Sequence, residues 1–233
     1  MVNSKYLFLK SFMFCLALSA GAHAGEIEWK ALNDQVMPQL QSGAFRQAEQ
    51  SARDSMAEAE KSFGAAHQNT ALSLSNLALV LRLQKRFEES EKHYRRSLAI
   101  RDKALGAAHP TTALTMLNLA DVLQAQRKYA EAEKLQRIVL PLFEKVHGED
   151  SRTATALNNL GANLQLQARY PEAEPYLRRA LAMKEKTLGP MNPSVAHTLN
   201  NLAELCEALG RKDEAAKYRA RAAEIQKQAS AKA

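Results

Sequence analysis

The stretch from Asn159 to Ala173, NLGANLQLQARYPEA, decides the fold because its landmarks recur along the chain. Tyr170 is followed three residues later by the small residue Ala173, and this aromatic and small pair returns at intervals of 42, 42 and 41 residues. The aromatic residues are Phe45, Phe87, Tyr129 and Tyr170, and the small residues are Ala48, Ser90, Ala132 and Ala173. A repeat of this length predicts stacked supersecondary units without a closed globular core.

Two further series keep the same register along the chain. One is an asparagine-led triplet, at Asn76-Leu77-Ala78, Asn118-Leu119-Ala120, Asn159-Leu160-Gly161 and Asn201-Leu202-Ala203. The other is a glycine series, at Gly64, Gly106, Gly148 and Gly189. Three independent series in one register argue against a chance origin for the repeat.

Each repeat is predicted to be a pair of helices. In the copy from Gly106, apolar residues such as Leu117 and Val122 follow a helical period, which stops at Gln126 to Lys128 and resumes from Tyr129. We call the two segments helix A and helix B. Because small residues stand where helix A faces helix B, we expect the two to approach closely, with the aromatic residue filling the space between copies.

The junctions between copies carry helix-end signals. The glycines are expected to end each helix B at positive φ, and Pro110 and Pro193 to occupy the first position of helix A. Asn192 is a predicted N-cap, Ser151 is expected to do the same in the third copy, and the junction histidines His67 and His109 are also expected to cap.

These landmarks resemble the tetratricopeptide repeat, in particular its kinesin-light-chain type with a 42-residue period. The resemblance covers about residues 64–228 and implies an all-α, right-handed α-solenoid of stacked antiparallel helix pairs. We expect full copies at 64–105, 106–147, 148–188 and 189–228, and a disordered tail at 229–233. A degenerate copy at 25–63 precedes them, and its first half is expected to be a shortened helix.

Residues 1–24 have the layout of a secretory signal peptide. Lys5 and Lys10 precede the apolar run 12–18, and Ala22 and Ala24 are the small residues that a signal peptidase reads. We expect cleavage after Ala24 and export to the periplasm. An uncleaved membrane anchor is the alternative, although the apolar run is short for a span.

Composition narrows the partners. Removing Lys5 and Lys10 with no acidic residue lowers the formal charge from +7 to +5, and the remaining cations are interleaved with glutamates. We therefore expect no nucleic-acid partner and no membrane span after cleavage. Cys206 would be the remaining cysteine, and its register with Leu81, Leu123 and Leu164 favours a small buried apolar residue over a reactive thiol.

The sequence offers no constellation for catalysis. It lacks a phosphate-binding glycine loop, a nucleophile elbow and a paired-histidine metal motif, and its histidines are scattered. We expect no enzyme activity, no catalytic residue, no metal site and no cofactor.

The resemblance implies that helix A lines a concave groove. The repeated asparagines would then form a ladder, either pairing with the backbone of an extended peptide or bonding neighbouring repeats. The candidate groove residues are Asn76, Arg82, Asn118, Asp121, Gln124, Asn158, Asn159, Gln165, His197, Asn200, Asn201 and Glu204.

The charge of this groove separates it from better-known relatives. Lysine is absent from the helix A segments, so neither a carboxylate clamp nor a preference for acidic peptides carries over. We expect a scaffold that binds an extended segment of an unidentified partner protein. The alternatives are an assembly subunit that uses its convex or terminal faces, including self-association, and an accessory subunit of an envelope enzyme.

Overall fold

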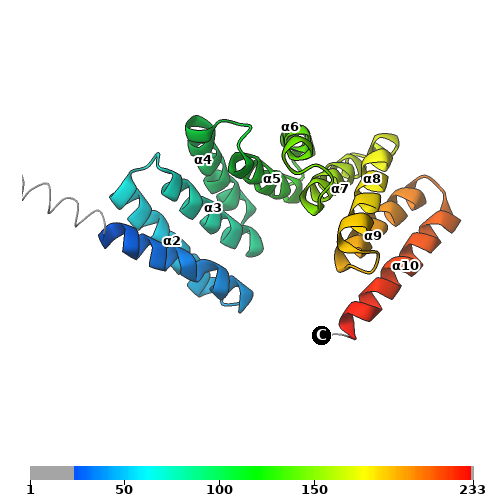
Figure 1. The fold of residues 1–233 in the computed structure, drawn as a ribbon, viewed down its shortest axis with the longest axis horizontal. Coiled ribbons are helices and arrows are strands. Elements are labelled where there is room, and N and C mark those ends of the chain that lie inside the picture. Colours follow the sequence, from blue (N-terminus) through cyan, green and yellow to red (C-terminus); the bar gives the residue numbers. More distant parts are fainter. Residues whose placement is uncertain (1–23, 232–233) are drawn as a thin grey trace, which may run out of the picture. The chain divides into compact units, whose positions relative to one another are not determined.

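The computed structural model describes residues 24–231, which form helices and no strand (Figure 1). Within each unit, consecutive helices pack against each other as antiparallel pairs, so the predicted all-α fold of stacked pairs is confirmed. The signal-peptide prediction falls on residues 1–23, which lie outside the described part, as do residues 232–233. The chain divides into two compact units, Met1–Gly106 and Ala107–Ala233.

The first unit contains a helix over residues 24–41, then α2 (Phe45–Phe63), α3 (Gln68–Leu83) and α4 (Phe87–Leu105). The first of these is not shortened, contrary to expectation. The buried Trp29 donates from Nε1 to Ser73 Oγ at 2.8 Å, and Val36 packs in a cluster with Leu77. These contacts with α3 replace the missing asparagine triplet as the reason for a full-length helix.

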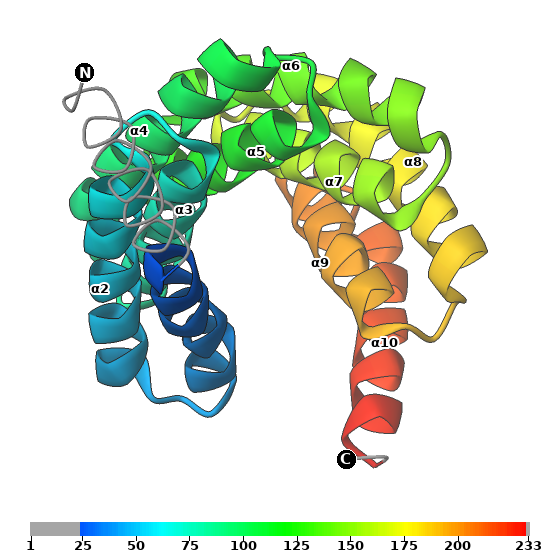
Figure 2. The ribbon, with the colours of Figure 1, turned by 60° about the vertical axis from the view of Figure 1, so that its left-hand side comes forward.

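The second unit contains six helices, α5 (Pro110–Ala125), α6 (Tyr129–His147), α7 (Ser151–Leu166), α8 (Tyr170–Leu188), α9 (Pro193–Ala208) and α10 (Lys212–Ser230) (Figure 2). α5, α7 and α9 are the A helices of this unit, and α6, α8 and α10 are its B helices. α7 also contacts α9 directly, so successive A helices lie side by side. α10 continues to Ser230, so residues 229 and 230 are helical.

The junction signals act mostly as predicted. Pro110 and Pro193 begin α5 and α9, and the side chain of Asn192 accepts from the backbone N–H of Ser194 at 2.9 Å. His67 and His109 cap α3 and α5 in the same way. The prediction for Ser151 is wrong, because the N-cap of α7 is Asp150, whose carboxylate accepts from the next two backbone N–H groups.

The small residues hold helix A close to helix B. Ser90 on α4 donates from Oγ to the carbonyl of Ala78 on α3 at 2.7 Å. In the third full copy, a methyl group added at Gly161 would lie 2.7 Å from Leu177 Cγ. Cys206 is fully buried in the same layer, as its register with leucine predicted.

The repeated aromatic residues do not fill the space between copies. Phe45 is 42% exposed, and Phe87, Tyr129 and Tyr170 are partly exposed at the first position of each helix B. The buried position lies seven residues further on, where Tyr94 and Leu177 have no exposed surface. Two helical turns separate the positions, so the residue nearer the helix centre reaches the core.

The helix A to helix B turn needs one residue at positive φ. Gly43 and Gly210 provide it at the two ends of the described repeats, whereas Lys85, Arg127 and Ala168 adopt φ of 62°, 61° and 58°. A side chain in this left-handed region lowers stability by about 1–2 kcal/mol relative to glycine, and each of these three turns includes that cost.

We therefore expect Ala168→Gly to raise the free energy of unfolding by about 1 kcal/mol, because glycine adopts this conformation without a clash. Urea denaturation followed by circular dichroism measures the change. The matched control Ala182→Gly, on the exposed side of α8, should instead lower stability by about 1 kcal/mol. Loss of stability in both variants would contradict this assignment of strain.

Candidate functional site

A row of polar side chains joins the A helices of the second unit. Asn159 on α7 donates from Nδ2 to Asp121 Oδ1 on α5 at 3.3 Å, and Asn201 on α9 donates from Nδ2 to Asn158 Oδ1 on α7 at 3.1 Å. We call these four residues the amide row. All four side chains are partly buried, so water competes only in part for the hydrogen bonds between them.

A buried lysine extends the amide row into the core. Thr198 Oγ1 also donates to Asn158 Oδ1, at 3.0 Å, and Lys184 Nζ donates to Thr198 Oγ1 at 2.9 Å and to the Ser194 carbonyl at 3.2 Å. Lys184 is 5% exposed, and burial lowers the pKa of its ammonium group. Its two acceptors are neutral, so this cation fixes α8 against α9 without a carboxylate.

The other candidates are distributed along the same helices. In the first unit, Asn76 donates to Asn33 Oδ1 at 2.8 Å, and the partly buried Arg82 lies near the end of α3. In the second unit, Gln124 accepts from Gln136, and Gln165 donates to Glu204 at 3.4 Å. Asn118 and Asn200 are partly buried, whereas His197 and Glu204 are exposed.

The asparagine ladder thus takes up one of its two expected roles. Asn76, Asn159 and Asn201 each bond a polar residue of the preceding copy. An amide has two donor hydrogens and two lone pairs, so each side chain keeps capacity for a second partner. Pairing with a peptide backbone stays a prediction.

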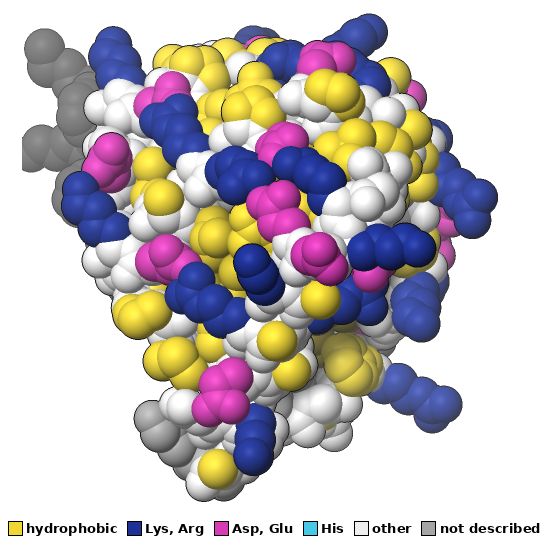
Figure 3. Space-filling model, turned by 90° about the vertical axis from the view of Figure 1, so that its right-hand side faces the viewer, with side chains coloured by type: hydrophobic (Ala, Val, Ile, Leu, Met, Phe, Trp, Pro, Cys, Tyr) yellow, Lys and Arg dark blue, Asp and Glu magenta, His cyan; other side chains and the backbone are white. Residues whose placement is uncertain are grey.

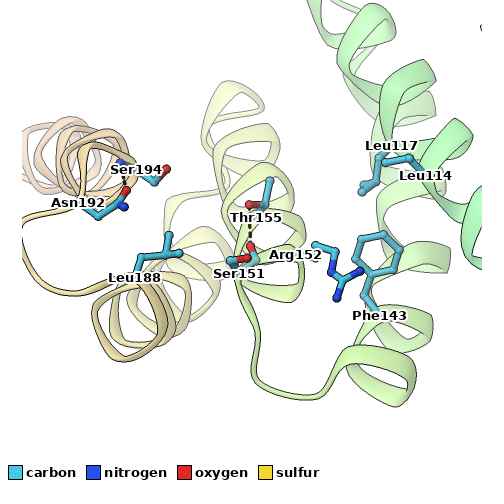
Figure 4. A pocket seen from close by; sticks show the side chains of 9 residues that line it. All are labelled: Leu114, Leu117, Phe143, Ser151, Arg152, Thr155, Leu188, Asn192 and Ser194. Carbon is cyan, nitrogen blue, oxygen red and sulfur yellow. Dashed lines mark hydrogen bonds between the residues drawn. The ribbon is translucent and has the colours of Figure 1, made fainter. Parts of the chain in front are cut away.

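A pocket of about 410 Å³ opens near the starts of α5, α7 and α9 (Figure 4). We call it the rim pocket; its lining residues are Leu114, Leu117, Phe143, Ser151, Arg152, Thr155, Leu188, Asn192 and Ser194. Leu114 is 52% exposed and Leu188 38%, while Phe143 is buried, so a solvated apolar surface faces the hydroxyls at the starts of α7 and α9. None of the twelve candidate residues lines it.

The charged group of the rim pocket is Arg152. Its Nε lies 2.9 Å from Asp150 Oδ2, and its side chain is 63% exposed. Burial opposes ionisation of Asp150, but backbone hydrogen bonds from Thr153 and Arg152 and the Arg152 side chain hold the pKa of that carboxyl below its usual range. The pocket thus combines apolar side chains of α5, α6 and α8 with polar side chains at the starts of α7 and α9.

The B helices carry a different polar network, which the repeat markers did not predict. Glu133 on α6 accepts from Arg137 of its own helix at 2.7 Å and from Arg169, just before α8, also at 2.7 Å. Glu174 accepts from Arg178 and Arg211 in the same register, as does Glu49 from Arg53 and Arg86 in the first unit. We call this set the glutamate ladder.

Figure 3 shows the side of the molecule on which α10 lies. Basic and acidic side chains are interspersed over this surface. Such pairing leaves little net field of one sign on that face.

The structure shows neither a metal cluster nor a membrane-spanning helix within residues 24–231. In this range, no three histidine, cysteine or carboxylate side chains gather as metal ligands would. The helices of the same range also lack the combined length and hydropathy needed to cross a bilayer.

Comparison with protein families decides the assignment. The family described as tetratricopeptide repeat matches residues 39–103, 71–145, 111–186 and 152–228, which together span most of the chain. This chain belongs to the tetratricopeptide repeat family. Such repeats are in general protein-interaction scaffolds and not catalysts, and no curated protein matches this chain.

Several solved structures share the fold. A kinesin light chain of Podosopora anserina with nearly identical TPR-like repeats aligns with TM-score 0.72 and 22% identity, covering 86% of this chain and 95% of that one. BtubC (BKLC) from P. vanneervenii aligns with TM-score 0.73 and 22% identity, covering 92% of each chain. A Rap protein complexed with Competence and Sporulation Factor aligns with TM-score 0.71 and 18% identity, over 86% of this chain and 54% of that one.

Register comparison could have revealed two of the missed features. Lys184 stands in register with Phe143 of the second full copy and with the buried Arg101 of the first, so a charge at a buried position was visible in the sequence. The ladder glutamates likewise recur four residues after each helix B aromatic residue. The rim pocket had no such signal, because it depends on how far Leu114 and Leu188 protrude.

We expect Glu133→Gln to lower the free energy of unfolding at pH 7 by about 1–2 kcal/mol, with water screening part of the loss. Burial opposes ionisation of Glu133, but bonds from Gln167 and Arg137 and the charge of Arg169 hold its pKa below the usual range. The contribution is complete above about pH 4.3 and disappears as pH falls through the lowered folded pKa.

Chemical denaturation between pH 3 and pH 7 checks this: the gap between wild type and Glu133→Gln should close toward the acid end. Glu224→Gln is the control, because this exposed carboxylate accepts a hydrogen bond from Gln228 of its own helix. A gap that stays constant with pH would count against an ionised Glu133 as the source.

Proposed function

We propose that this chain is a non-catalytic scaffold that binds an extended segment of a partner protein along α5, α7 and α9. The observation that carries the proposal is the position of the rim pocket relative to the amide row. Leu114, Arg152 and Ser194 line the pocket, and seven residues later on the same helices stand Asp121, Asn159 and Asn201. Seven residues are two helical turns, or about 10.5 Å, so pocket and row share one face of each helix.

The two parts of this face suit different parts of an extended chain. The amide row keeps donor hydrogens and lone pairs, which match the alternating N–H and C=O groups of a peptide backbone. The rim pocket has room for an apolar side chain, which would cover Leu114. The Rap structure, which holds Competence and Sporulation Factor, supports the idea that this fold accommodates a bound factor.

We further propose that the protein is exported to the periplasm after cleavage behind Ala24. The motivation is the sequence of residues 1–24, with its two lysines, apolar run and terminal small residues. Cys206, the cysteine that would remain, is buried, and burial raises the pKa of its thiol, which suits a protein that must avoid oxidation.

Leu114→Asp is expected to weaken partner binding by at least about tenfold, because one buried leucine contributes about 1.5–3 kcal/mol. A photo-crosslinking residue at Thr155 would capture the partner in cells that produce the protein, and mass spectrometry would identify the attached segment. The matched control is Leu166→Asp, which changes an exposed leucine on α7 that does not line the rim pocket. Equal crosslinking in both variants, with unchanged circular dichroism, would remove the pocket from the proposal.

The mature N-terminus is expected at Gly25 when the full chain is expressed in a Gram-negative host. Intact-mass measurement of the periplasmic fraction checks this, and replacing Ala22 and Ala24 by leucine should retain the uncut mass. A membrane fraction that carries the uncut wild-type chain would favour an anchor, and a cytoplasmic location would contradict export.

A further inference from the structure

α6 departs from α4, α8 and α10 at one position of the repeat, where α2 has Asp54. Arg96, Arg179 and Arg221 occupy the tenth position of their helices, and each pairs with an acidic residue of the preceding copy, with 2.5 Å between Arg96 and Glu60 and between Arg179 and Glu144. In α6 this position is Ile138, which is 47% exposed. An isoleucine replaces a paired arginine on a solvated surface.

Ile138 belongs to a continuous exposed line of residues. Lys134, Ile138, Pro141 and Lys145 follow at intervals of four, three and four residues, which places them on one side of the helix. All four are exposed, and Val146, 52% exposed, adjoins them. We call these four residues the α6 stripe: two apolar side chains between two lysines.

The lysines of the α6 stripe carry no ion pair within residues 24–231. Their neighbour Arg137 behaves differently, because it pairs with Glu133 at 2.7 Å. Two free charges therefore bracket the apolar pair, eleven residues apart, which is about 16 Å along a helix.

Stability does not account for this composition. Proline inside a helix removes a backbone hydrogen bond and costs about 3 kcal/mol in an ordinary helix interior, and Pro141 lies past the middle of α6, as Pro175 lies inside α8. Exposed isoleucine adds nothing to the core. Residues that break local rules without a packing gain are candidates for binding.

We propose that the α6 stripe docks an amphipathic helix of a partner protein, with two apolar side chains flanked by acidic residues about eleven positions apart. The apolar pair would bury Ile138 and Pro141, and the carboxylates would meet Lys134 and Lys145. This interaction is separate from the groove. It would let the protein act as an assembly subunit through the surface of α6.

The charges disfavour a second copy of the chain as the occupant. An antiparallel pair of α6 helices with two-fold symmetry about the apolar pair would place Lys134 opposite Lys145 of the other copy. Like charges held in contact are repulsive, so the stripe does not complement itself.

The test uses the full mature chain and a fluorescent helical peptide that carries two leucines between glutamates eleven residues apart. A second peptide has lysines in place of those glutamates. Fluorescence anisotropy at low salt should show binding of the acidic peptide to wild type. The Lys134→Glu/Lys145→Glu variant should bind it at least about tenfold more weakly and should prefer the basic peptide.

Ile138→Arg is the second variant, and it restores the residue found in three other copies, so the fold should persist. It too should weaken acidic-peptide binding about tenfold. The control is Lys92→Glu on α4, which stands in register with Lys134 but precedes Arg96 and not an isoleucine; it should leave binding unchanged.

Three results would overturn the proposal. One is equal affinity for the acidic and basic peptides, or affinity that the stripe variants do not alter. Another is a dimer in sedimentation that Ile138→Arg dissolves, which would assign the stripe to a second copy. The last is stripe-dependent binding to vesicles of phosphatidylglycerol without peptide binding, which would assign it to a lipid surface.

Discussion

The close approach of helix A to helix B is the constraint on which the other features depend. A solenoid has no closed core, so each helix pair buries its apolar surface only against itself and its neighbours. Ser90 bonds the backbone of Ala78 directly, and Gly161 leaves no space for a methyl group beside Leu177. Because packing at this layer is so tight, each small residue makes room for a larger neighbour, as Gly161 does for the fully buried Leu177.

The glutamate ladder adds register to this packing. Each ladder carboxylate accepts one arginine from its own helix and one from the next copy, so a shifted helix would leave a partly buried charge without its partner. The glutamate ladder ends at both sides of the repeats. Ala44 stands where later copies have the arginine donor, and Ala216 stands where earlier copies have the glutamate acceptor. Apolar contacts add to the packing of the flanking helices, such as those of Trp29 with Phe63 and of Ile225 with the α9 cluster.

Periodic features of this chain were predictable and single contacts were less so. Helix pairs, the proline starts and the cap at Asn192 follow from local rules that act the same way in every copy. The cap at Ser151 failed because Asp150, one residue earlier, offers a charged acceptor for two N–H groups. The exposed position of Phe45 and the full-length first helix depend on contacts between copies, which periodicity does not reveal. The asparagines illustrate the limit: their spacing was visible, but not whether they bond each other or a ligand.

Departures from the repeat separate into two kinds, and the distinction bears on function. Lys184 places a charge at a buried position, but Thr198 and the Ser194 carbonyl accept hydrogen bonds from its ammonium group, so the fold itself compensates for the charge. Ile138 places an apolar side chain on the surface, and nothing within the second unit covers it. A departure that the fold compensates can be retained for structure alone. A departure that the fold leaves exposed, such as Ile138, adds to stability only when another molecule covers it. For this reason α6, and not α8, is the B helix that indicates a partner.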